Sequence, residues 1–145
     1  MKKFLMMALA FILALAFIPA QQGQAKLKNG TYKVNYTVMD AQGKSVSYGN
    51  DYFVKPATVT VKNGKMTARI TIKKSGWIKK FSATTGGNKV VSRNKKKNTR
   101  VVQFNVSSLS SKKPTTVKTR VEIPSQHYKH SYTMKFKFGS AKKVK

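Results

Sequence analysis

Alternation of apolar and polar residues, with a period of two, is the feature that most constrains how this chain folds. The first alternating segment places Tyr32, Val34, Tyr36 and Val38 on one face, with polar residues between them. The same pattern returns in four further segments, at residues 66–72, 102–106, 117–123 and 132–138. A period of two is typical of a strand with one buried face, so each segment predicts a half-buried strand.

Helical periodicity is missing from the chain after residue 25. No segment there keeps an apolar period of 3.6 residues over three turns, and β-branched and aromatic residues dominate the alternating segments. We therefore expect an all-β fold, an immunoglobulin-like antiparallel β-sandwich of about eight strands. The pair Asn63-Gly64 predicts a two-residue hairpin turn. Residues 43–53 are too rich in Ser, Gly and Asn for a strand, so they predict a loop with one short helical turn.

Residues 1–25 are expected to form a secretory signal peptide. A basic start precedes an apolar run from Phe4 to Ile18, about 15 residues long, which is shorter than the roughly 20 residues that cross a bilayer as a helix. Small residues at Gly23 and Ala25 favour cleavage after Ala25, with cleavage after Ala20 as the second choice. We therefore expect a secreted, extracellular product, in which residues 26–139 form one domain and residues 140–145 a basic C-terminal tail.

The charge of the chain limits its partners. Thirty Lys and Arg stand against three Asp and Glu, a formal net charge of +27, and loss of Lys2 and Lys3 with the signal leaves 27 − 2 = +25. Such a surface attracts polyanions and favours electrostatic retention at an anionic cell wall. The chain has no cysteine, so stability has to come from packing rather than from disulfides.

The sequence offers little material for catalysis. Its three carboxylates, Asp40, Asp51 and Glu122, are far apart in sequence, which disfavours a site built on two carboxylates. His127 and His130 are expected on opposite faces of a strand, and without cysteine they make a poor zinc site. We therefore do not expect an enzyme.

Tyr128 and Tyr132, with His130 between them, are the strongest candidates for chemistry. In an extended strand these three side chains point the same way. A phenolate suits ferric iron, and tyrosine is an established axial ligand of haem, while a second phenol on the same face can donate a hydrogen bond to the first. The spacing also fits ordinary strand tyrosines that find a hydrogen bond without any ligand. On spacing alone both interpretations stay open.

Four stretches of the chain carry a family resemblance. They are residues 27–36, residues 47–57 continuing to 64, residues 75–81, and the segment Tyr128–Tyr132 with its strand. In this order and at these intervals they resemble a near-iron transporter (NEAT) domain, the haem-binding module of Gram-positive surface and secreted proteins. The resemblance covers about residues 27–138 and implies a secreted haemophore of a Gram-positive bacterium.

The resemblance implies roles for single residues. Tyr128 would be the axial ligand of the haem iron, with Tyr132 hydrogen-bonded to it, whereas His130 is a competitor that we do not expect to bind the iron. Ser47 would bond a haem propionate, although it could serve only as a helix cap. The remaining candidates for the haem pocket are Tyr48, Tyr52, Trp77, Ile78, Val121 and Ile123.

The expected function is therefore capture of ferric haem (iron protoporphyrin IX) and its transfer to a receptor. Host haemoglobin is a candidate donor, and another NEAT protein is the expected acceptor. The alternative from a different class is a cell-surface protein that binds polyanions, such as anionic cell-wall polymers, through its positive charge; nucleic acid is the less favoured polyanion. A NEAT domain whose ligand is haemoglobin itself is also less favoured, because the segment around residue 48 lacks a dense aromatic run.

Overall fold

The computed structural model describes residues 27–145, so the predicted signal peptide lies outside the described residues. The strands are β2 (Gly30–Met39), β3 (Ala57–Lys62), β4 (Lys65–Lys73), β5 (Ile78–Ala83), β6 (Lys89–Asn94), β7 (Thr99–Val106), β8 (Thr115–Ile123) and β9 (Tyr128–Lys143). Two 3-10 helices, η3 (Tyr48–Tyr52) and η4 (Pro124–Gln126), complete the described part of the chain. Over residues 27–145, no helix has the length and apolar character needed to cross a membrane.

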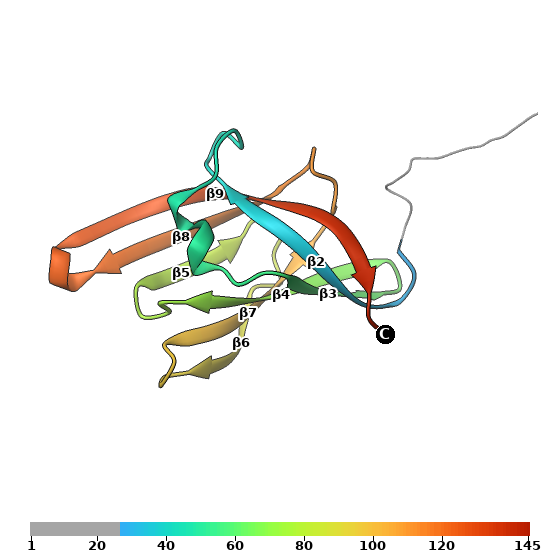
Figure 1. Cartoon of the computed structure of the whole chain (residues 1–145), viewed down its shortest axis with the longest axis horizontal. Coiled ribbons are helices and arrows are strands. Elements are labelled where there is room, and N and C mark those ends of the chain that lie inside the picture. The colour runs from blue at the N-terminus through green and yellow to red at the C-terminus, as the bar shows by residue number, and fades with distance from the viewer. Residues whose placement is uncertain (1–26) are drawn as a thin grey trace, which may run out of the picture.

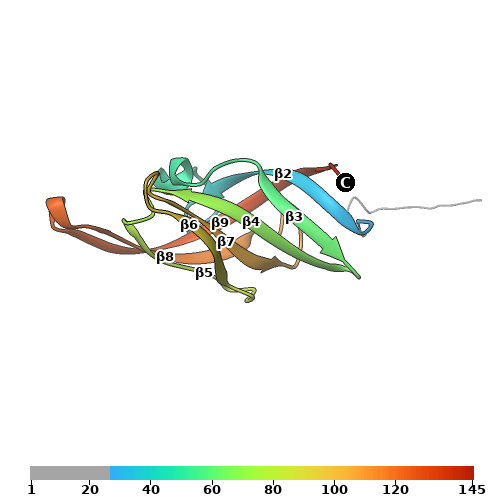
Figure 2. The same cartoon turned by 90° about the horizontal axis from the view of Figure 1, so that it is seen from below.

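The eight strands form one antiparallel sheet in the order β5-β8-β9-β2-β3-β4-β7-β6. The sheet curls until its first and last strands come near each other, which gives the two layers visible in Figure 1 and, from below, in Figure 2. This arrangement confirms the predicted all-β sandwich of about eight strands. The two edge strands, β5 and β6, are not hydrogen-bonded to each other.

Aromatic rings from both layers meet around Phe136 in the centre of the core. The Phe136 side chain is fully buried. Its ring centroid lies 5.1 Å from Phe53, 5.6 Å from Tyr36, 5.9 Å from Phe81 and 6.2 Å from Phe104. Such edge-to-face and offset pairs add to the hydrophobic gain from burying the rings. The cluster joins strands that are far apart in the sheet order, so it holds the curled sheet closed.

Two local predictions are confirmed. Asn63 and Gly64 join β3 to β4 with φ angles of 52° and 81°, as a two-residue turn with positive φ at both positions requires. The segment 43–53 is a loop that carries one helical turn, η3. Sequence chemistry alone was sufficient for both, because each depends on a few adjacent residues.

The C-terminal boundary differs from the prediction. Residues 140–143, which the sequence suggested as part of a tail, continue β9 and pair with β2, with Lys143 opposite Tyr32. The Thr31 amide also donates to the Lys145 carbonyl at 2.7 Å. The apolar alternation ends at Phe138, but backbone hydrogen bonds to β2 need no apolar side chains.

Phe136→Ala should lower the free energy of unfolding by about 3–5 kcal/mol, because it removes the ring at the centre of the aromatic cluster and leaves a cavity. Urea denaturation measures this change. Lys137→Ala, at the adjacent exposed position, is the control and should stay within about 0.5 kcal/mol of the unchanged protein. Equal effects of the two substitutions would contradict the central role of the cluster.

Candidate functional site

The hairpin of β8 and β9 extends beyond the rest of the sheet (Figure 1). Its strands pair to the tip, where η4 and His127, at φ 51°, reverse the chain. Along β9 the environment changes within a few residues: Tyr128 is 37% exposed, Tyr132 is partly buried against the core, and Met134 is 3% exposed. Side chains on one face of a single strand therefore run from solvent into the core.

The hydroxyl groups of Tyr128 and Tyr132 are hydrogen-bonded to each other. The buried tyrosines behave differently: the hydroxyls of Tyr32 and Tyr36 each donate to a backbone carbonyl 2.6 Å away, and burial raises the pKa of Tyr36. Structural tyrosines are usually satisfied in this way. At the hairpin the two phenols have each other instead, and one is well exposed, so an oxygen is available to a ligand.

His130 lies between the two tyrosines on the same face. Its ring centroid is 4.5 Å from that of Tyr132 and 6.3 Å from that of Tyr128. The imidazole is exposed and is therefore an accessible alternative metal ligand. Geometry alone does not remove it as a competitor for iron.

The other face of the hairpin carries an ion pair that the sequence analysis missed. Arg120 Nε lies 2.9 Å from Glu122 Oε2, and the same guanidinium donates to Ser131 Oγ on β9 at 3.1 Å. The hydrogen bond from Arg120 lowers the pKa of Glu122. Opposite charges two residues apart in a strand share a face, which is the signal that could have identified the pair. Glu122 is thus engaged away from the tyrosine face.

The helical turn η3 is anchored to the end of β2. Ser47 caps it by accepting a hydrogen bond from the Gly49 amide at 3.0 Å. The Asn50 side-chain oxygen accepts from the Val38 amide at 2.8 Å and from Lys55 Nζ at 2.7 Å. A hydroxyl that accepts one bond keeps its own hydrogen to donate, so capping leaves Ser47 free to donate to an anionic group.

Gly49 sets η3 against β9. A β-carbon at this position would lie 2.7 Å from Met134 Cε, two residues along β9 from Tyr132. Glycine thus permits the close approach of the two segments. On η3 itself, Tyr48 is fully exposed and Tyr52 is partly buried against the core. The structure therefore brings the predicted serine and tyrosines of η3 to the end of the sandwich that carries the tyrosine hairpin.

Three of the four remaining candidates, Ile78, Val121 and Ile123, lie on β5 and β8, and Trp77 directly precedes β5. Ile78 and Val121 are paired and only 1% and 5% exposed, so they belong to the core. The Trp77 carbonyl accepts a hydrogen bond from the Glu122 amide at 2.8 Å, and its ring is partly exposed. Ile123 is partly buried and pairs with Tyr128. Trp77 and Ile123 are thus the two of these four candidates whose side chains are partly exposed.

Exposed apolar side chains gather near these elements. The described part of the chain has six large exposed hydrophobic residues, and four of them lie in η3, beside it in the sequence, or in the hairpin. These four are Val46, Tyr48, Val54 and Tyr128. Three of these four side chains thus lie in or beside η3 and one at the start of β9.

The model of the NEAT family, described as an iron transport-associated domain, matches residues 25–140 of the chain. The chain belongs to the NEAT family. It is 42% identical to the hemin/hemoglobin-binding protein 1 of Listeria monocytogenes over 98% of its own length and 70% of that protein. It is 31% identical to the iron-regulated surface determinant protein C of Staphylococcus aureus over 99% of its length, and there it spans 65% of the relative.

Solved structures of NEAT domains are also similar. The NEAT5 domain of IsdX2, a hemophore of B. anthracis solved in complex with heme, is 37% identical, with a TM-score of 0.73 over 77% of this chain and 97% of that one. A point mutant of the same domain with heme gives 38% identity and a TM-score of 0.74, over 78% of this chain and 97% of that one. These neighbours confirm the NEAT fold of the sandwich.

Asn50→Ala should destabilise this NEAT domain by about 1–3 kcal/mol, because it leaves the buried amide of Val38 without an acceptor. Urea denaturation and hydrogen exchange of the Val38 amide measure the loss. Asn50→Asp keeps an oxygen acceptor at the same place and should retain most of the stability. If the alanine and aspartate variants unfold alike, the hydrogen bond does not hold η3.

Proposed function

We propose that this NEAT domain is a secreted haem-binding protein that captures ferric haem through Tyr128 and passes it to a receptor for iron acquisition. The observation that carries the proposal is the pair of hydroxyl groups of Tyr128 and Tyr132, bonded to each other at the exposed end of β9. Among the relatives, one is named for binding hemin and hemoglobin and another was solved with heme.

The two phenols would take different roles. Tyr128, the more exposed, would ligate ferric iron through its oxygen, since an ionised phenol is a hard anionic ligand. Tyr132, held against the core, would donate a hydrogen bond to that oxygen and favour its ionised form. His130 stays outside the coordination in this proposal.

The segment η3 would cover the other side of the ligand. The hydroxyl of Ser47 can donate a hydrogen bond to a haem propionate while it caps the turn. Lys44, three residues earlier in the sequence, would supply a positive charge to the same propionate. Tyr48 offers an exposed ring and Tyr52 a partly buried one. Together with Trp77 and Ile123 these side chains supply the apolar surface that a porphyrin requires, above the buried pair Ile78 and Val121.

Transfer follows from the placement of the site at the rim. The ligand residues lie on the exposed hairpin and on the surface turn η3 rather than in a closed cavity. An acceptor, here another NEAT protein, can approach without unfolding of the donor, and the step is an exchange of ligands on iron. Haemoglobin of a host is the proposed source of the haem.

Tyr128→Phe should abolish most haem binding, because it removes the ligand oxygen and leaves the ring in place. Titration with haemin, followed by the Soret band and the tyrosinate charge-transfer band, measures this loss. Tyr132→Phe should weaken binding by roughly ten- to a hundredfold while the tyrosinate band persists, since such supporting hydrogen bonds have that effect.

His130→Ala is the matched control for the tyrosine variants, and it should leave the spectrum of the ferric complex unchanged. If Tyr128→Phe keeps the tyrosinate band, or if His130→Ala removes it, the assignment of the ligand is wrong. Circular dichroism of each variant shows that the sandwich is intact.

Reduction of bound haem with dithionite should speed its release to an acceptor such as apomyoglobin. Ferrous iron is the softer ion and favours an anionic oxygen less than ferric iron does. Stopped-flow absorbance gives the transfer rates of the two oxidation states, measured without oxygen. Equal rates would contradict phenolate ligation as the control of release.

A further inference from the structure

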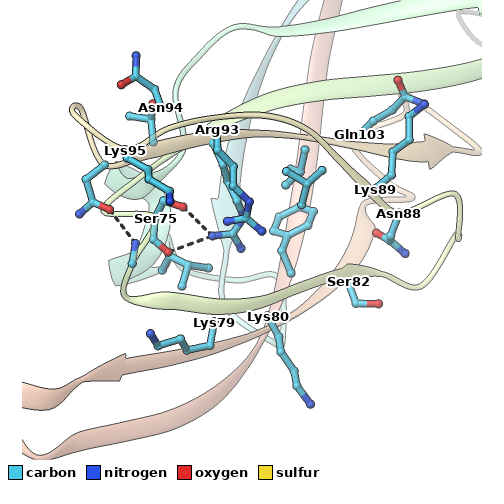
Figure 3. A pocket seen from close by; sticks show the side chains of 18 residues that line it. Ser75, Lys79, Lys80, Ser82, Asn88, Lys89, Arg93, Asn94, Lys95 and Gln103 are labelled. Carbon is cyan, nitrogen blue, oxygen red and sulfur yellow. Dashed lines mark hydrogen bonds between the residues drawn. The ribbon is translucent and has the colours of Figure 1, made fainter.

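A second candidate site lies where the curled sheet nearly closes. Between edge strand β5 on one side and strands β6 and β7 on the other there is a cleft of about 610 Å³. Figure 3 shows Arg93 reaching into this space from β6 and Lys89 farther along β6, whereas the side chains of Lys79 and Lys80 on β5 point away from Arg93. Of the residues proposed to bind haem, only the buried Ile78 also lines the cleft.

All charged residues in the lining of the cleft are cations. The lining contains no Asp or Glu, and six of its 18 residues are Lys or Arg. These six are Lys79, Lys80, Lys89, Arg93, Lys95 and Arg100. The ion pair of Arg120 with Glu122 is the one salt bridge between residues 27 and 145, and neither partner lines the cleft. Among the cations of the cleft, Lys79 lies close enough to Glu122 to lower the pKa of that carboxyl, but no carboxylate lies in the lining itself.

Arg93 and Arg100 form a pair of like charges in the cleft. They are directly opposite each other in the pairing of β6 with β7, an arrangement that costs stability for like charges. Arg100 is only 6% exposed, and its guanidinium bonds the Ser75 carbonyl at 3.0 Å and the Ser75 hydroxyl at 2.9 Å, both neutral acceptors. Burial, and then the neighbouring Arg93, lower the pKa of Arg100. An anion between these side chains would remove the repulsion.

Both edges of the cleft are irregular. The pairing of β5 with β8 shifts between Ile78 and Lys80, and that of β6 with β7 shifts between Val90 and Ser92. Bulges of this kind turn side chains away from the regular direction and often lie beside functional sites. Lysines on edge strands also prevent pairing with other sheets. An experiment therefore has to distinguish anion binding from this protective role.

We propose that the cleft between β5 and β6 binds phosphate groups of a flexible phosphodiester polymer that carries no bases, of the poly(glycerol phosphate) type. Guanidinium groups match phosphate oxygens through paired hydrogen bonds, and the lysines supply further charge along the chain of the polymer. This site shares only the buried Ile78 with the proposed haem site and would hold the protein on an anionic surface.

The lining favours a polymer without bases over nucleic acid. Proteins that bind single strands stack the bases on exposed aromatic rings. The cleft is lined by no Tyr, Trp or His. Its one aromatic residue, Phe81, packs on Phe104 at 5.6 Å and on Phe53 at 6.0 Å, so this ring is engaged in the core.

The test measures binding of fluorescently labelled poly(glycerol phosphate) to the purified protein by fluorescence anisotropy. The triple variant Lys79→Gln, Lys89→Gln, Arg93→Gln removes three exposed charges from the cleft. It should lower the affinity at least about tenfold, since several charge-assisted hydrogen bonds are lost. The dependence on salt concentration should also become shallower. Haem binding should be unchanged, which shows that the variant is folded.

The matched control removes the same charge elsewhere. Lys62→Gln, Lys112→Gln and Lys142→Gln are exposed and lie outside the cleft, and together they should lower the affinity by less than about threefold. Equal losses in the two triple variants would overturn the proposal in favour of diffuse attraction. It is also overturned if the polymer does not bind, if poly-glutamate of equal charge binds as well, or if single-stranded DNA binds more tightly.

Discussion

Strand β9 couples the core of this protein to its proposed ligand site. Phe136 and Phe138 on this strand are buried in the core, and Tyr132 and Tyr128 lie on the same face toward its beginning. Because successive side chains of a strand alternate between faces, the position of the buried rings determines where the two phenols point. A slip of one residue would turn both phenols to the face of Arg120 and Glu122. The aromatic cluster therefore fixes the register of the tyrosine pair.

Because carboxylates are scarce, the electrostatics of this chain are dominated by unneutralised positive charge. With three Asp and Glu against 30 Lys and Arg, most cations have no partner within the protein and repel one another. Folding is supported instead by burial of apolar residues and by the ladders of the sheet. Anionic ligands meet little competition from carboxylates on such a surface, which would favour haem propionates at the proposed haem site and phosphates at the proposed cleft site.

The sequence predicted what depends on local pattern. Period-two alternation located the strands, and Asn63-Gly64 and residues 43–53 had turn chemistry that the structure confirms. The tyrosine spacing located the hairpin face and suggested a hydrogen bond between the two phenols, which the structure contains. The cleft could not be predicted from the sequence. Lys79 lies on β5 and Arg93 on β6, the first and last strands in the sheet order, and these two strands come near each other only because the sheet curls.

Strand β8 connects the two proposed sites within the sheet. It pairs with the edge strand β5, which borders the cleft, and with β9, which carries the tyrosines. Because β5 and β9 both pair with β8, the edge of the cleft and the hairpin belong to one continuous piece of sheet. The hairpin projects away from the closed part of this sheet (Figure 1). A protein held by phosphates in the cleft would therefore keep its tyrosine rim directed outward, where a haem donor or an acceptor can reach it. Retention at a surface and exchange of ligand would then be compatible, because the two proposed sites share only the buried Ile78.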